Sequence, residues 1–210
     1  MAWDCATGTG QAAQGLSPFF DHIVATDASE KQISQAQGAD NISFRIATAE
    51  KTELETSSVD LIVVAQALHW FDHDAFYQEV KRVLKPGGIL AVWTYDLLEI
   101  NEKIDPIIHK LNDDIVGEYW PSERQLVRDK YQTIDFPFQE KAAPSFSMAS
   151  SWTRDDLIGY LGTWSSVVRY RADKGRDPLQ EIMPALSAAW GQHSDKKTIQ
   201  WPLSFRIGCC

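Results

Sequence analysis

The sequence Ala2-Trp-Asp-Cys-Ala-Thr-Gly-Thr-Gly-Gln11 contains a short apolar run, an aspartate and then a glycine-rich turn. Ala12, Ala13 and Leu16 follow it and predict a helix that begins after Gly10. A strand that ends in Gly-x-Gly and continues into a helix lets a ligand approach the backbone without Cβ clashes, and it directs free N–H groups at that ligand. This part of the chain therefore predicts a site for a nucleotide-type cofactor.

Two kinds of cofactor fit this pattern. Gly8-Thr-Gly-Gln-Ala-Ala13 satisfies the dinucleotide fingerprint G-x-G-x-x-G/A, and Asp27 ends the next apolar run, near the position of an acidic ribose contact. Asp4, however, lies four residues before Gly8 and extends the pattern to Asp-x-Ala-x-Gly-x-Gly. The turn alone leaves both alternatives open.

Composition limits the classes of protein that the chain can belong to. Its 210 residues suit one α/β domain, and a net charge of −9 without a visible basic face argues against a nucleic-acid partner. No apolar run approaches the 18 residues of a membrane span, and the N-terminus does not resemble a signal peptide, so we expect a cytoplasmic protein without a membrane partner. Cys5, Cys209 and Cys210 lack metal-ligand spacing, and we expect no metal site.

Apolar patterns in the first 95 residues predict strands alternating with helices. After the opening strand, the expected strands cover residues 22–27, 42–46, 59–65 and 88–93. The expected helices follow Gly10, cover residues 30–37, and run from Phe76 through Leu84 to a stop at Pro86-Gly-Gly88. This alternation predicts a doubly wound α/β fold with a right-handed, mostly parallel sheet.

The second half is less regular. One helical face is expected in residues 104–115, and a strand near residues 140–147. Thr153 and Asp156 form a potential capping box, and Asp177-Pro178 predicts the start of a helix that Gly191 closes. Residues 198–208 alternate as a strand, in which Pro202 requires an edge or a bulge. We expect a single domain over residues 1–210, with a helical insertion at 97–135.

Several segments together resemble the class I S-adenosylmethionine (SAM)-dependent methyltransferases. The resemblance is to the small-molecule group called methyltransferase type 11, and within it to trans-aconitate methyltransferase-like proteins. It covers nearly the whole chain and implies a seven-stranded Rossmann-like sheet. The segments that carry it are Asp4–Gly10, Val24–Asp27, Ala47–Glu50, Val59–Leu61, Ala65–Asp72, Val83–Gly88, Trp164-Ser and Trp201-Pro-Leu.

The resemblance implies roles for residues in the turn and the next strand. Gly8 and Gly10 would lie under the cofactor, and Asp4 would order the loop near the cofactor's amino group. Ala6 replaces the usual first glycine, which narrows the room under the methionine part. Asp27 would accept both ribose hydroxyls, a role that suits a carboxylate.

Further along, the resemblance implies that Ala49 and Glu50 meet the adenine and that Gln66 and Ala67 face the methionine part. Aromatic side chains at 70 and 71 could stabilise the sulfonium by cation–π attraction. His69 is a candidate general base, although a lone histidine is more often structural.

The implied reaction is methyl transfer from SAM to a small-molecule acceptor, with a carboxylic acid as the expected acceptor because its carboxylate needs no base. Acceptor recognition would fall to residues 97–135 and 150–172. Four arginines are candidates for holding an acidic acceptor, although solvated surface charge is the more common role: Arg124, Arg128, Arg169 and Arg171.

Two alternatives remain open at this point. Family members usually carry a helix before the first motif that covers the cofactor, so we expect weak SAM binding, or a non-catalytic relative, without it. Tyr77-x-x-x-Lys81 resembles a short-chain dehydrogenase pair and keeps an NAD(P)-dependent dehydrogenase as the less favoured alternative. We expect a monomer or a weak dimer.

Overall fold

The structure is a computed structural model that describes residues 1–209, and its contacts divide the chain into two compact units. Unit 1 comprises Met1–Tyr95, Leu126–Ser145 and the described residues from Ser204 onward. Unit 2 comprises Asp96–Gln125 and Phe146–Leu203. The segment expected as one insertion, residues 97–135, is thus shared between the two units.

Unit 1 is built on a mixed sheet whose first five strands are parallel, which confirms the doubly wound α/β fold. The strand order is β3-β2-β1-β4-β5-β8-β6, so the first strand of the chain lies in the middle. The last two strands run antiparallel to their neighbours. The strand bounds are β1 Ala2–Cys5, β2 Ile23–Asp27, β3 Ile42–Ile46, β4 Val59–Ala65, β5 Leu84–Thr94, β6 Gln139–Lys141 and β8 Lys197–Cys209.

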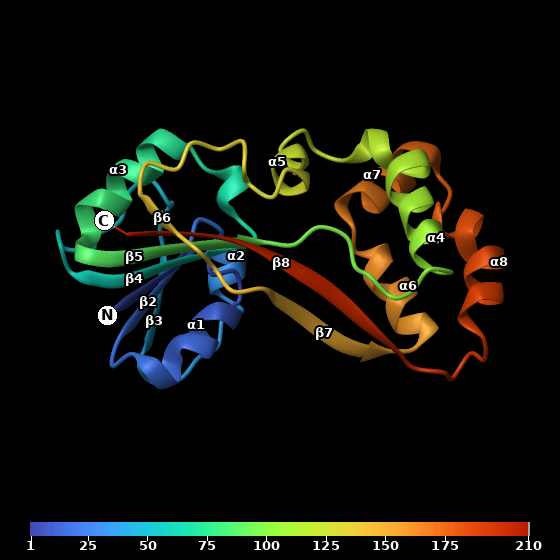
Figure 1. The fold of residues 1–210 in the computed structure, drawn as a ribbon, viewed down its shortest axis with the longest axis horizontal. Helices are drawn as coiled ribbons and strands as arrows, with labels where there is room; N and C mark the ends of the chain where they lie inside the picture. Colours follow the sequence, from blue (N-terminus) through green and yellow to red (C-terminus); the bar gives the residue numbers. More distant parts are fainter. Residues whose placement is uncertain (210) are drawn as a thin grey trace. The chain divides into compact units, whose positions relative to one another are not determined.

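The alternation of side chains along β1 explains why helices cover both faces of the sheet. Trp3 and Cys5 belong to the core under α3 (His73–Val83), whereas Ala2 packs with Ala13 of α1 (Gln11–Leu16). Helices α3 and α1 lie on opposite sides of the strands (Figure 1). Burial of both faces makes the strand fully inaccessible to solvent. A central parallel strand of this kind brings its carboxyl end to the sheet edge where ligands of such folds bind.

Several element boundaries differ from the expected ones. Helix α2 covers only Glu30–Ile33, shorter than the expected 30–37. Helix α3 ends at Val83, since Leu84 pairs with Val59 as the start of β5. The strand expected near 140–147 is two strands, β6 and β7 (Phe146–Trp152), which pair with different parts of β8.

Unit 2 consists mainly of helices with one strand pair. Its capping box is present as expected, with Thr153 and Asp156 bonding each other's backbone N–H. Pro202 lies opposite Ser147 of β7, and its nitrogen faces the same side as the Gln200 N–H, which bonds Glu99. In the described residues no strand pairs with Pro202 on that side, so the expected edge position is confirmed.

The remaining elements are short. Helix α8 begins at Leu179, one residue after Pro178, and ends at Trp190, with Gly191 as the residue that closes it, as expected. Among the described residues, we find no helix with the length and hydropathy that a bilayer crossing requires. The bounds are η1 Ser17–Phe19, η2 Leu68–Trp70, α4 Asp105–His109, the π-type turn η3 Lys110–Ile115, η4 Gly117–Tyr119, α5 Arg124–Arg128, α6 Arg154–Gly162, α7 Ser165–Lys174 and α8 Leu179–Trp190.

Two glycines near α1 provide a matched test of this packing. Gly10 has a φ of +96°, and an added Cβ would lie 2.8 Å from the Phe44 ring, whereas nothing lies within 4 Å of a Cβ at Gly15. We expect Gly10→Ala to lower the free energy of unfolding by about 1–3 kcal/mol. Gly15→Ala, inside the helix, should raise it by up to about 1 kcal/mol. Urea denaturation measures both, and equal effects would contradict this packing.

Candidate functional site

The carboxylate of Asp4, at the carboxyl end of β1, holds the glycine-rich turn in place. Its Oδ2 accepts hydrogen bonds from Thr7 Oγ1 at 2.5 Å and from the backbone N–H of Ala13 at 2.9 Å. The side chain is fully buried, and Oδ1 has no hydrogen-bond partner in the described part of the chain. Asp4 therefore links the glycine-rich loop to the first turn of helix α1.

Burial also changes the acidity of this group. Loss of hydration raises the pKa of Asp4 to about 6, while the bonds from Thr7 and Ala13 oppose the shift and the charge of Asp27 adds to it. The side chain therefore changes charge near neutral pH.

The turn uses the left-handed region of backbone conformation three times, at Ala6 (φ 57°), Gly8 (φ 59°) and Gly10 (φ 96°). Only glycine adopts this region without penalty, and a Cβ there costs roughly 1–2 kcal/mol. The position of Ala6, where the resembled motif has glycine, is thus strained by its own backbone. Open space adjoins Gly8, and its N–H donates to Asp27 Oδ2 at 2.9 Å.

A cavity of about 450 Å³ lies at the carboxyl ends of the central strands of unit 1. Six of the nine residues expected to contact the cofactor line it, and the other three, Asp4, Gly8 and Gly10, form the turn beside it. The lining residues are Ala6, Asp27, Ala28, Gln32, Ala47, Thr48, Ala49, Glu50, Ala65, Gln66, Ala67, Trp70 and Phe71.

Asp27 brings a carboxylate to this cavity from the end of β2. Its Oδ2 accepts the N–H of Gly8, and its Oδ1 accepts the N–H of Ser29 at 2.8 Å. Ser29 caps α2 with its own side chain, which accepts from Gln32. Each Asp27 oxygen thus carries one backbone bond and retains acceptor capacity, because a carboxylate oxygen has two lone pairs.

Ala49 and Glu50 line one wall of the cavity and belong to a loop that side chains of α3 hold in place. Glu79 of α3 accepts the backbone N–H and the hydroxyl of Thr52, and Arg82 donates to the carbonyl of Leu54. Glu50 Oε1 accepts the N–H of Asp72 at 3.1 Å. Side chains of the helix thus position a wall that has no regular secondary structure of its own.

Gln66 lines the cavity directly after the end of β4. Its φ of +55° turns the chain sharply after β4, and its side chain points to the end of β5. There Nε2 donates to the carbonyl of Tyr95, and Oε1 accepts from the Tyr95 N–H and from Thr94 Oγ1. The amide is therefore engaged within the protein.

The residues after Gln66 form η2, with Trp70 and Phe71 on the cavity and Trp70 59% exposed. His69 Nδ1 lies 2.8 Å from the hydroxyl of Tyr131, a partner that the sequence does not predict. Burial raises the pKa of Tyr131 to about 12, against hydrogen bonds with Thr94 and with the backbone at His69 and Leu68 that lower it. The phenol therefore stays neutral at physiological pH.

The residues behind the dehydrogenase alternative lie elsewhere. Tyr77 is buried in α3 among Phe136, Phe138 and His73, does not line the cavity, and its hydroxyl has no partner in the described residues. Burial raises the pKa of Tyr77 to about 12, opposite to the activation that a catalytic tyrosine needs. The pair with Lys81 is thus a feature of helix packing.

Three of the four candidate arginines are engaged within unit 2. Arg124 forms an ion pair with Asp96 and stacks on Trp120. Arg171 bonds both oxygens of Asp177, and Arg169 donates to the carbonyl of Tyr119. Arg128, at the end of α5, is exposed. The three arginines of unit 2 thus bind three different partners.

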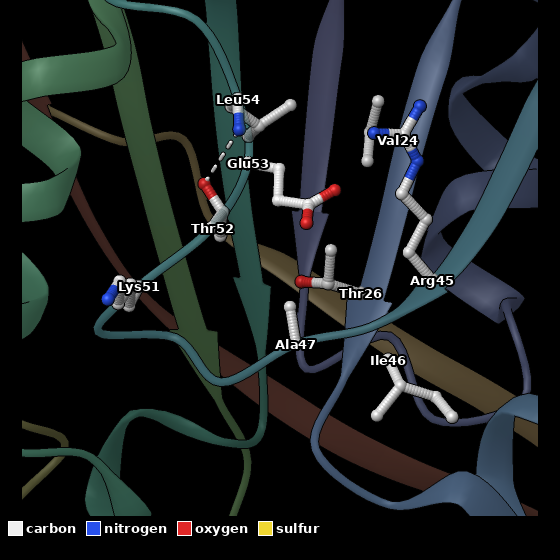
Figure 2. Close-up of a pocket in the computed structure, with 9 residues that line it drawn as sticks. All are labelled: Val24, Thr26, Arg45, Ile46, Ala47, Lys51, Thr52, Glu53 and Leu54. Carbon is white, nitrogen blue, oxygen red and sulfur yellow. Dashed lines mark hydrogen bonds between the residues drawn. The ribbon is translucent and has the colours of Figure 1, made fainter.

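Figure 2 shows a second cavity in unit 1, of about 300 Å³, that contains none of the predicted site residues. Arg45 and Glu53 extend over it, and Thr52 Oγ1 accepts the N–H of Leu54. The hydroxyl of Thr26 on its floor already accepts the indole N–H of Trp3. The described residues also contain no cluster of potential metal ligands.

Comparisons with known proteins agree with this geometry. A methyltransferase-domain family model matches residues 3–92. A protein of Dictyostelium discoideum described as a methyltransferase is 35% identical to this chain, and the match covers 90% of this chain and 73% of the length of that protein. A solved structure from Anaeromyxobacter dehalogenans, described as a type II methyltransferase, is 42% identical with a TM-score of 0.94, over 99% of this chain and 88% of that chain. A Saccharomyces cerevisiae protein described as a SAM-dependent methyltransferase is 22% identical to this chain, and the match covers 83% of this chain and 72% of the length of that protein.

The buried carboxylate predicts a specific pH dependence of stability. Between the unfolded pKa of 3.8 and the folded pKa of about 6, the native state binds more protons, so this group's contribution to stability falls as the pH rises. The asparagine side chain of the Asp4→Asn variant does not titrate, so the variant lacks this pH dependence. We expect the difference in unfolding free energy, wild type minus variant, to fall by about 2 kcal/mol between pH 4 and pH 7. Asp21→Asn, at an exposed site, is the control, and a flat difference for Asp4→Asn would refute the assignment.

Proposed function

Because the chain belongs to the SAM-dependent methyltransferases, we propose that it transfers a methyl group from SAM to a small-molecule acceptor, with a carboxylic acid oxygen as the expected site of methylation. The observation that carries the cofactor assignment is the cavity beside the turn, where Asp27 offers a carboxylate beside the strained Ala6. The methyl acceptor follows from the resemblance and is tested separately below.

The residues present fit SAM. Asp27 would accept the ribose hydroxyls with the lone pairs left after its bonds to Gly8 and Ser29. Ala49 is small and buried and would leave room for an adenine ring against the loop that α3 anchors. Gly8 adjoins open space, which permits close approach of the methionine part to the backbone.

Bound SAM supplies an electrophilic methyl group on a sulfonium. The task of the chain is then to align the acceptor oxygen and to exclude water. Trp70 and Phe71 present aromatic rings at the cavity, where they would favour a cationic sulfonium. A carboxylate acceptor loses no proton during transfer, so alignment by these residues would account for most of the catalysis.

Calorimetric titration with SAM and its product S-adenosylhomocysteine tests the cofactor site, with NADH as the negative control. We expect micromolar binding of the adenosyl ligands and none of NADH. Asp27→Asn should weaken SAM binding about 10- to 100-fold, because hydrogen bonds to a charged group contribute about 1.5–3 kcal/mol. Asp21→Asn removes an equal charge at an exposed position and should leave the affinity unchanged.

Binding without methylation of any acid in a panel of carboxylic acids would favour another acceptor class. Absence of binding would instead favour a non-catalytic relative. An unchanged affinity in Asp27→Asn would contradict the ribose assignment, provided that its unfolding free energy shows a folded protein.

Ala6→Gly tests the departure from the motif. Removal of the Cβ relieves the left-handed strain and enlarges the cavity beside the turn, so we expect SAM to bind several-fold more tightly. The same calorimetric titration measures this change. Weaker binding than in the wild type would show that the Ala6 methyl group contacts the cofactor favourably.

A further inference from the structure

Strand β7 of unit 2 pairs with β8 along one side only. Its seven residues, Phe146–Trp152, lie opposite β8 from Leu203 to Lys197, and in the described residues no strand lies along the other side of β7. The first four residues of β7 are exposed, and among them the side chains of Phe146 and Met148 are 51% and 39% exposed. The strand therefore presents an open edge with apolar side chains on it.

The hydrogen bonds of Gln200 in β8 show which backbone groups of β7 face this open edge. Gln200 exchanges two backbone hydrogen bonds with Glu99, so its N–H and C=O point away from β7. Gln200 lies opposite Ala149, which makes theirs a non-hydrogen-bonded pair, and Ala149 likewise directs its N–H and C=O away from β8. Because this direction repeats at every second residue, Ser147, Ala149 and Ser151 carry the outward-facing backbone groups.

The open edge of β7 lacks the features that usually keep edge strands apart. Such strands are commonly protected by charged residues, by proline or by being very short. The two strands at the ends of the main sheet follow this rule, since β3 contains Arg45, and β6 is three residues long with Glu140 and Lys141. From residue 145 to residue 153, by contrast, the chain contains neither a charge nor a proline. The edge of β7 is thus open to pairing with another strand.

A second copy of β7 fits this edge in antiparallel orientation about Ala149, its middle residue. All seven residues then overlap, with Ser147 opposite Ser151 of the second copy and Ala149 opposite its own equivalent. These are the residues with outward-facing backbone groups, so each pair exchanges N–H···O=C bonds in both directions. Phe146 comes to lie opposite the partly exposed Trp152 of the second copy, and cross-strand aromatic pairs stabilise antiparallel sheets.

Charge and size define the strength of this pairing. The chain has a net charge of −9, but the uncharged strand brings no like charges opposite each other. Stable interfaces of standard size use about 20–30 residues on each side, whereas β7 supplies seven. We propose that β7 is the interface of a weak homodimer, in which two copies of the chain pair antiparallel about Ala149. This inference goes beyond the proposed function and does not depend on it.

Sedimentation equilibrium of the full chain tests the dimer. We expect a monomer at about 5 μM and a clear dimer fraction at about 500 μM, as suits a small interface. Ala149→Pro removes the central outward N–H without removing a bond to β8, and should weaken the dimer about 10-fold or more. Ala149→Ser keeps that N–H and should associate like the wild type.

Two controls accompany this measurement. Urea denaturation establishes that the Ala149→Pro variant is folded, and calorimetry should show unchanged SAM affinity, because the cofactor cavity lies in unit 1. A chain that stays monomeric at about 500 μM would leave the edge to a different polypeptide and overturn the proposal. A dimer that Ala149→Pro does not weaken would place the interface elsewhere and overturn it too.

Disulfide cross-linking tests the register without a proline. Residue 149 and its equivalent would have Cα atoms about 5.5 Å apart, within disulfide range, so Ala149→Cys should give a linked dimer with copper phenanthroline as oxidant. Thr198→Cys is the matched control, exposed on β8 opposite Ser151. It would lie about 14 Å from its equivalent, three strand spacings away, and should stay unlinked. The wild type, with its native cysteines, gives the background, and equal linking of both variants would refute the register.

Discussion

The buried carboxylate of Asp4 is the constraint on which the site depends. One of its oxygens accepts hydrogen bonds from both Thr7 and the backbone of Ala13, so it links the end of β1, the glycine turn and the start of α1. This arrangement costs hydration, which is why the Asp4 pKa rises to about 6. The hydrogen bonds to Asp4 support the strained turn together with the bond from the Gly8 N–H to Asp27.

The side chains that line the cavity beside the turn are held in place by hydrogen bonds within the protein. Asp27 accepts two backbone N–H groups, Gln66 is bonded to β5, and the loop that carries Glu50 is tied to α3 through Glu79. Held groups lose little conformational entropy when a ligand binds, which favours preorganised recognition.

Tyr131 connects a late, irregular part of the chain with this cavity. Arg206, at the end of β8, donates to the carbonyls of Tyr131 and Ile134 and pairs with Glu140, so the last strand fixes the segment that presents the phenol. The antiparallel pairing of β8 thus helps to place Tyr131 against His69, which follows the carboxyl end of β4. A change at either place is expected to reach His69 through few, identifiable bonds.

The sequence by itself determined the features that depend on neighbouring residues. The spacing of Asp4, Gly8 and Gly10 and the apolar strands predict the turn and the parallel sheet, because helix and strand periods and turn conformations are local properties. The cavity-wall positions Ala49, Glu50 and Gln66 came from the resemblance to the family. Only the tertiary structure decided that Gln66 turns its amide to β5, that β6 and β7 are separate strands, and that Tyr131 meets His69. Those outcomes join residues distant in the chain, His69 and Tyr131 being 62 positions apart, and they depend on packing and hydrogen-bond satisfaction that no local pattern records.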